Sequence, residues 1–239
     1  MRTPMELPEL LMSVVFLGTF IGLMFMALQN QAKAAQVVKI ESVVPNSMVF
    51  VAMAVGILCF LHFVRRLNLK EAFGIEQASP LETIGWAAML IMAALPVVGA
   101  ANLITMQLMK DSVTPQPLIE LFNNVAREGN HVAVAQIFVA GVILAPCCEE
   151  FLFRGFFYGV WKRYLGPLGA GLLVSALFAA FHTSLSAFAG LFVLAVCLNM
   201  AYERTGSLLV PIGMHALFNF SSLFFLYVQA HSPGVPAHP

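Results

Sequence analysis

Long apolar stretches separated by short polar ones dominate the pattern of this sequence. Seven apolar segments can be delimited, and they cover residues 10–29, 46–64, 84–108, 132–162, 168–183, 187–202 and 207–228. Five of them reach the ~20 residues that a helix needs to cross a bilayer, and the pair at 168–183 and 187–202 is shorter. Backbone polar groups must be paired internally in lipid, so these segments are expected to be helices.

The composition agrees with this pattern. Hydrophobic residues make up 60% of the 239 residues and charged residues only 10%, whereas an ordinary soluble domain carries about 25% charged residues. So few charges cannot cover a water-facing surface. Lysine plus arginine balances aspartate plus glutamate at 12 each, and the chain has no long basic run, so no nucleic-acid partner is expected. The sequence therefore predicts an all-α, polytopic membrane protein with about seven to eight transmembrane helices.

The two ends of the chain and its middle loop add detail to this organisation. The first apolar run resembles the core of a signal peptide, but its length favours a retained membrane helix. The loop at 109–131 contains a candidate interfacial helix over residues 118–128. We expect N-terminal helices and an outer loop over residues 1–130, a helical core over 131–228, and a disordered tail over 229–239.

Basic residues predict how the chain lies across the membrane. If the spans alternate, one side collects Arg2, Arg65, Arg66, Lys70, Lys162, Arg163 and Arg204, and the other collects Lys33, Lys39, Lys110 and Arg127. Loops rich in lysine and arginine face the cytoplasm. The first group is therefore expected in the cytoplasm, with the N-terminus inside and the C-terminus outside.

Ionisable residues inside apolar segments are costly and usually functional. The stretch Cys147-Cys-Glu-Glu-Phe-Leu-Phe-Arg154 holds two glutamates and an arginine. Glu150 and Arg154 are four residues apart on a helix, so they share a face and are expected to form an ion pair. Glu149 projects ~100° away from that face. An unpaired, buried carboxylate is suited to act as a general base or acid. Both glutamates would also fit a purely structural role in helix packing.

Two further polar positions lie in later apolar segments. His182 follows the stretch Phe178-Ala-Ala-Phe, and His215 precedes Asn219 by one helical turn. An imidazole and an amide on one face can bind a metal or stabilise an oxyanion. The number of helical residues between each of these side chains and the turn at the expected cytoplasmic end of its helix is similar, and the same holds for Glu149. All of them therefore lie at a similar depth in the membrane. We therefore expect Glu149, His182, His215 and Asn219 to line one polar intramembrane cavity. Phe178 is interpreted as a packing residue.

These motifs resemble those of the CAAX-prenyl-protease and bacteriocin-processing family of intramembrane endopeptidases, over about residues 132–222. The resemblance implies hydrolysis of a peptide bond in a membrane-associated or prenylated-type substrate, at a site open to the cytosol. It implies that Glu149 and His182 activate water, that His215 and Asn219 stabilise the oxyanion, and that Glu150 and Arg154 support the site. The expected location is the cytoplasmic membrane of a bacterium, and the expected partners are membrane lipid and a peptide or protein substrate.

The resemblance leaves the cofactor and the function class open. No cofactor is favoured, but zinc is an alternative, and its ligands would be Glu149, His182 and His215. Buried glutamate and histidine are also used by proton-coupled transporters, although no internal repeat supports that function. A non-catalytic immunity or scaffold protein of the membrane is the third alternative.

Overall fold

The computed structural model describes residues 7–33, 40–109 and 117–232, and every regular element within these ranges is a helix. Three segments, labelled η, have the wider π-helical turn. In chain order the elements are α1 (Leu7–Lys33), α2 (Ile40–Cys59), η1 (Phe60–Val64), α3 (Leu69–Ala72), α4 (Pro80–Met109), α5 (Pro117–Arg127), α6 (His131–Phe138), η3 (Val139–Leu144), α7 (Ala145–Glu150), η4 (Phe151–Tyr158), α8 (Gly159–Phe181), α9 (Leu185–Thr205) and α10 (Leu209–His231).

All seven apolar segments expected from the sequence are helical. Within the described ranges, five helical stretches are long and apolar enough to cross a membrane. One of them runs from His131 to Phe181 and combines two expected segments. It is broken at Gly166, where φ is 68° and ψ is 170°, so it consists of two arms. The all-α, polytopic membrane fold is therefore confirmed. Part of the expected tail, residues 233–239, lies outside the described residues, as do Arg2, Lys39 and Lys110.

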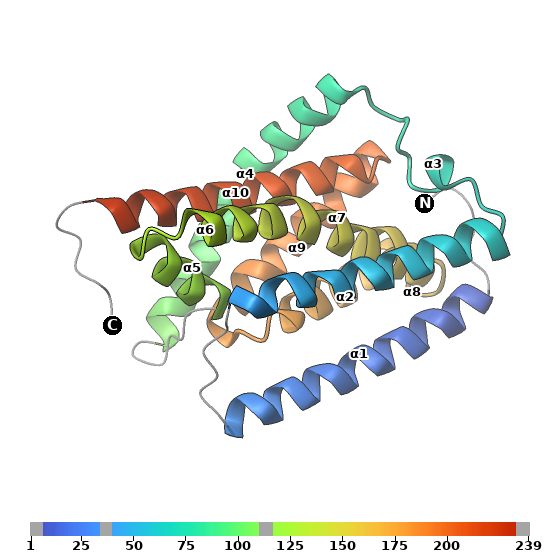
Figure 1. Cartoon of the computed structure of the whole chain (residues 1–239). Coiled ribbons are helices and arrows are strands. Elements are labelled where there is room, and N and C mark those ends of the chain that lie inside the picture. The colour runs from blue at the N-terminus through green and yellow to red at the C-terminus, as the bar shows by residue number, and fades with distance from the viewer. Residues whose placement is uncertain (1–6, 34–39, 110–116, 233–239) are drawn as a thin grey trace.

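The helices pack as a bundle in which α9 lies between α4 and α8, and α4 also contacts α10. α10 contacts η3, α7 and α5, while α2 covers α7, η3 and α6 from another side (Figure 1). α5 is the helix expected at the interface. Its buried residues Leu121, Phe122 and Val125 pack in one apolar cluster with Ile137 of α6. This arrangement places α7, which carries both glutamates, between α2 and α10.

One end of the bundle gathers the turns for which a cytoplasmic position is expected (Figure 1). Arg65, after α2 and η1, forms an ion pair with the buried Glu9 of α1. Lys162 forms an ion pair with Glu203 at the end of α9. The turn after α3 is attached to the turn before α10, because the backbone N–H of Leu208 donates to the carbonyl of Phe73 at 3.0 Å. These contacts join loops that are far apart in the sequence.

The same end contains a glycine that no other residue could replace without strain. Gly74 has φ of 63°, and a Cβ atom added there would lie 1.8 Å from the carbonyl oxygen of Gly206. Gly129 has a similar φ of 69°, but an added Cβ would meet no atom within 4 Å. The left-handed backbone alone costs about 1–2 kcal/mol for a residue with a Cβ. We therefore expect Gly74→Ala to lower the melting temperature clearly more than Gly129→Ala does, as measured by thermal unfolding in detergent. Equal effects would contradict the close approach of the two turns.

Candidate active site

The helix that carries the two glutamates is irregular on both sides. α7 is a short α-helical stretch between two π-helical segments, η3 and η4. Pro146 lies in its first turn, where proline has no N–H to donate to the preceding turn. The wide turn of η3 just before it accommodates that missing hydrogen bond. Single π-helical turns inside longer helices are frequent at functional sites. The irregularity therefore coincides with the motif that the sequence singled out.

Glu150 is the centre of a buried ionic network. Its Oε1 accepts a hydrogen bond from Nη1 of Arg154 at 2.9 Å, and both side chains are fully buried. The same oxygen lies 2.8 Å from Nδ1 of His215 on α10. Nη2 of Arg154 donates to the carbonyl of Ala195 on α9 at 3.0 Å. The ion pair expected from the i, i+4 spacing is therefore present. The contact with His215 extends it to a third helix.

Phe178 of α8 lies beside this network. Its side chain is fully buried, and the guanidinium carbon of Arg154 lies over its ring at 4.6 Å from the centroid. The ring also contacts His215, at 5.6 Å between centroids, and His182, at 4.8 Å. Three polar side chains therefore meet at the Phe178 ring: Arg154 of η4, His215 of α10 and His182 at the end of α8. The interpretation of this residue as simple packing did not anticipate these contacts.

His182 lies where α8 ends. The helix ends at Phe181, and Thr183, two residues further on, has a left-handed backbone with φ of 50°. Nδ1 of His182 is 2.8 Å from the carbonyl oxygen of Phe178. A carbonyl can only accept, so Nδ1 carries the proton and donates. Nε2 is then left as the nitrogen that can accept a proton or orient a water molecule.

Glu149 has no bonded partner of the kind that Glu150 has. Oε2 of each glutamate is buried without a partner among the described residues, but Oε1 of Glu150 is bonded to Arg154 and His215, whereas Glu149 makes no hydrogen bond with any described residue. It lines a cavity of about 140 Å³ together with Ser47, Phe50, Leu144 and Ala145. Buried polar atoms are nearly always paired in proteins, and exceptions commonly mark functional groups or water sites. The expectation that Glu149 projects away from the Glu150–Arg154 face is met.

The four residues expected to line one cavity have different surroundings. Glu149 lines the small cavity, whereas His215 is bonded to Glu150, and Nδ2 of Asn219 donates to the carbonyl of Gly141 at 2.8 Å. No group of three or more His, Cys, Asp or Glu side chains in the described ranges is arranged to hold a metal ion. Glu149, His182 and His215 therefore do not stand together as zinc ligands in this structure.

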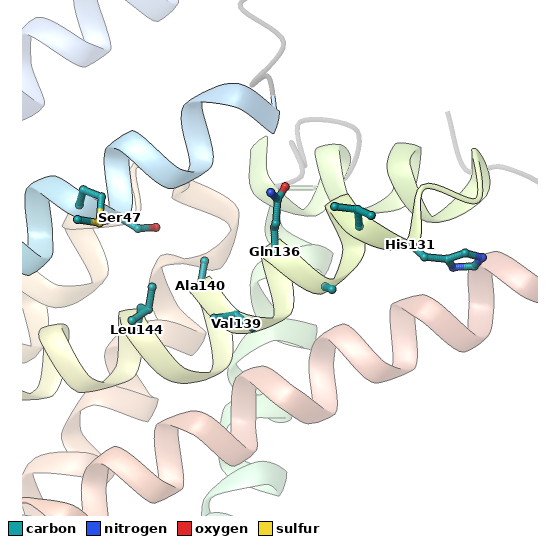
Figure 2. A pocket seen from close by; sticks show the side chains of 9 residues that line it. Ser47, His131, Gln136, Val139, Ala140 and Leu144 are labelled. Carbon is teal, nitrogen blue, oxygen red and sulfur yellow. The ribbon is translucent and has the colours of Figure 1, made fainter.

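A larger groove leads away from the Glu149 cavity. It has a volume of about 520 Å³ and lies between α2 and the α6–η3 helix; its lining residues are Ser47, Met48, His131, Val132, Ala135, Gln136, Val139, Ala140 and Leu144. Ser47 and Leu144 line both spaces. Figure 2 shows Ser47 and Leu144 towards one end of the groove and His131 at the other. The groove thus extends from the small cavity towards the start of α6.

Sequence reasoning missed the contribution of α2 to this site. The N-terminal part of the chain holds no recognised motif, yet Ser47 and Phe50 of α2 form one wall of the Glu149 cavity. A serine inside an apolar segment was the one available signal. It is weak, because a membrane serine can bond to its own helix, and Oγ of Ser47 does donate to the carbonyl of Val43 at 2.9 Å.

Together these features define a polytopic helical membrane protein with a buried ionic network beside a carboxylate-lined cavity. Residues 131–221 match the family of type II CAAX prenyl endopeptidases, Rce1-like. The resemblance seen in the motifs is thus confirmed over these residues. An uncharacterized 24.3 kDa protein of Escherichia coli is 40% identical over 78 residues, which cover 30% of this chain and 36% of that relative. The chain therefore matches only about a third of this relative's length. No solved structure matches.

Proposed function

We propose that this protein is an intramembrane endopeptidase that hydrolyses a peptide bond in a membrane-associated substrate. The observation that carries the proposal is the buried, unpaired carboxylate oxygen of Glu149 on a cavity next to the Glu150–Arg154–His215 network. The match of residues 131–221 to a family of endopeptidases supports the reaction class. Peptide hydrolysis needs an activated water molecule, and a carboxylate without a partner can take its proton.

Each polar side chain has a role in this proposal. Glu149 accepts the proton of the attacking water, and Nε2 of His182 orients that water, since Nδ1 is held by the carbonyl of Phe178. His215 and Asn219 stabilise the oxyanion. The amide of Asn219 has two N–H donors, of which the structure commits one to Gly141. Glu150 and Arg154 hold His215 in place. Loss of one oxyanion donor commonly lowers kcat by ~10²–10³-fold.

We further propose that the reaction uses these side chains without a metal ion. Nε2 of each histidine stays available as a donor atom, but no three His, Cys, Asp or Glu side chains in the described ranges are arranged to hold a metal ion together. The test is the cleavage rate of the purified protein after treatment with a zinc chelator. An unchanged rate supports the proposal, whereas a rate that falls and returns on addition of zinc contradicts it.

The groove between α2 and α6–η3 indicates what kind of substrate is bound. Its wall is mostly apolar: of its three polar residues, Ser47 is already bonded to its own helix through Oγ, and His131 and Gln136 are exposed on α6. An extended peptide would bring more backbone N–H and C=O groups than these side chains could pair, at a cost of several kcal/mol (~2–7) for each group left unpaired. A hydrocarbon chain brings none. Helix residues 131–144 span ~20 Å at 1.5 Å per residue, so we propose that a hydrocarbon anchor of the substrate lies in this groove.

The proposal is tested with purified protein in lipid bilayers and two peptides of the same sequence, one with a hydrocarbon chain and one without. Cleavage is followed by mass spectrometry of the products, with Glu149→Gln as the inactive control. We expect the wild-type protein to cleave the peptide with the hydrocarbon chain and not the peptide without it. Glu149→Gln should cleave neither. If neither peptide nor a broader peptide library is cleaved, the protein is not an endopeptidase of this kind.

Blocking the groove should separate anchor binding from chemistry. Ala135 lies on the groove wall, and Ala135→Trp would fill it. We expect KM for the anchored peptide to rise at least about tenfold, the effect that one or two lost methylene contacts can produce, with kcat little changed. Ala88→Trp is the matched control, because Ala88 is exposed on α4, away from the groove. An unchanged KM in Ala135→Trp would show that the anchor binds elsewhere.

A further inference from the structure

We propose that Phe178 is a positioning residue of the active site, whose ring holds the ionic network and His182 in a fixed relation. The inference rests on the proposed function, because it assigns Phe178 to the same reaction. Phe178 is fully buried and borders none of the described cavities. It therefore acts through its neighbours rather than on the substrate.

The first contact is with the arginine. The guanidinium of Arg154 is fully buried, and its Nε atom has no hydrogen-bond partner among the described residues. Its carbon lies 4.6 Å above the centroid of the Phe178 ring. The negative face of an aromatic ring attracts a cation, and the attraction is strongest where water is excluded. The ring thus compensates part of the cost of burying Arg154 and fixes the plane of its guanidinium. That plane determines where Nη1 meets Glu150.

The second set of contacts is with the two histidines. The Phe178 ring lies edge-on to His215, at 5.6 Å, and tilted against His182, at 4.8 Å. His215 belongs to the network through Glu150, whereas His182 makes no hydrogen bond to that network within the described residues and contacts it through Phe178. The ring is therefore the physical spacer between the group proposed to orient water and the group proposed to bind the oxyanion.

The backbone and the ring of Phe178 can be tested separately. The bond from Nδ1 of His182 goes to the backbone carbonyl, which every substitution retains. Phe178→Leu removes only the ring, with its contacts to Arg154, His182 and His215. Phe178→Tyr retains an aromatic face in the same place. A role in positioning predicts that activity follows the aromatic face and not the apolar volume alone.

The matched control is Phe122, which is also fully buried but lies in the separate apolar cluster of α5, α6 and α10. Its ring contacts Phe138 and none of the site residues. Phe122→Leu removes the same number of atoms from a packed core. It should lower the melting temperature about as much as Phe178→Leu and leave kcat per folded molecule unchanged.

We expect Phe178→Leu to lower kcat by about 10- to 100-fold, since misplacement of a catalytic group by about 1 Å has effects of this size. KM should stay within about twofold, because the ring does not border the groove, and Phe178→Tyr should recover most of kcat. Amounts are normalised to the folded fraction measured by thermal unfolding. A fall in kcat that Phe122→Leu reproduces, or no fall in Phe178→Leu, would overturn the proposal.

A second measurement does not depend on activity. Protein labelled with ¹⁵N-histidine reports the ring nitrogens of its six histidines, and His182→Gln and His215→Gln variants assign the two signals. We expect both signals to shift in Phe178→Leu and neither in Phe122→Leu. If the signals shift but wild-type protein cleaves no peptide, the positioning stands and the proposed function fails. If cleavage occurs and the signals do not shift, the positioning role of Phe178 is refuted.

Discussion

Glu149→Gln is expected to abolish peptide cleavage and to leave the protein folded. Glutamine has the shape of glutamate but cannot accept the proton of water. General-base catalysis is typically worth ~10²–10⁴-fold, so kcat should fall by at least that range. The melting temperature should equal that of the wild type, because Glu149 makes no hydrogen bond with the described residues that the substitution could remove. The measurement is the cleavage rate together with the melting temperature in detergent.

Glu149→Asp is the companion variant. It retains a carboxylate but withdraws it by one methylene from the cavity, so partial activity is expected between the rates of the wild type and Glu149→Gln. Near-wild-type cleavage by Glu149→Gln would show that another group activates the water. Loss of folding in Glu149→Gln would show that the carboxylate has a structural role.

Glu150→Gln is expected to reduce both stability and activity. Removing one partner of a buried ion pair leaves the other charge uncompensated, at a cost of ~3–5 kcal/mol. Here the buried charge is that of Arg154, and Glu150 also holds His215. We expect a large fall in melting temperature, together with a kcat per folded molecule reduced by ~10²-fold through the misplaced His215. Thermal unfolding and the cleavage assay measure the two effects on the same preparations.

The double variant Glu150→Gln/Arg154→Met separates the two effects. Replacing both members of a buried pair removes the uncompensated charge, so stability should return towards that of the wild type. Activity should not return, because His215 still lacks its carboxylate. Glu203→Gln is the control for an ordinary ion pair. Its partner Lys162 is partly exposed, and pairs of that kind are worth ~0–1 kcal/mol. Recovery of activity in the double variant would contradict the proposed role of Glu150.

The helical fold could be predicted from the sequence because the bilayer limits the possible structures. An apolar run of bilayer length must be a helix, and each of the seven segments is one. Pro146 is a sequence signal for an irregular helix at η3, whereas the η4 segment contains no proline and its π-helical turns could not be predicted. The break at Gly166 lies between the segments 132–162 and 168–183 that the sequence predicts, so the two arms are separate as expected.

The candidate site was predictable where it depends on spacing along one helix. The Glu150–Arg154 pair follows from four residues of separation, and the structure contains it. The bond between Glu150 and His215 joins residues 65 positions apart. It depends on how α7 and α10 are rotated about their own axes, which spacing does not determine. The same holds for Phe178, whose importance comes from what surrounds it.

The position of α2 has a consequence for how relatives of this protein can diverge. α2 forms one wall of both the groove and the Glu149 cavity, while the ionic network is built from α7, η4 and α10, within the matched stretch 131–221. Under the proposed function, the groove has one wall outside the matched stretch, in α2, and the other inside it, in α6 and η3. Substitutions in residues 40–64 would then reshape the first wall without replacing any residue of the ionic network, so a helix exchanged between two relatives would carry part of the substrate preference with it.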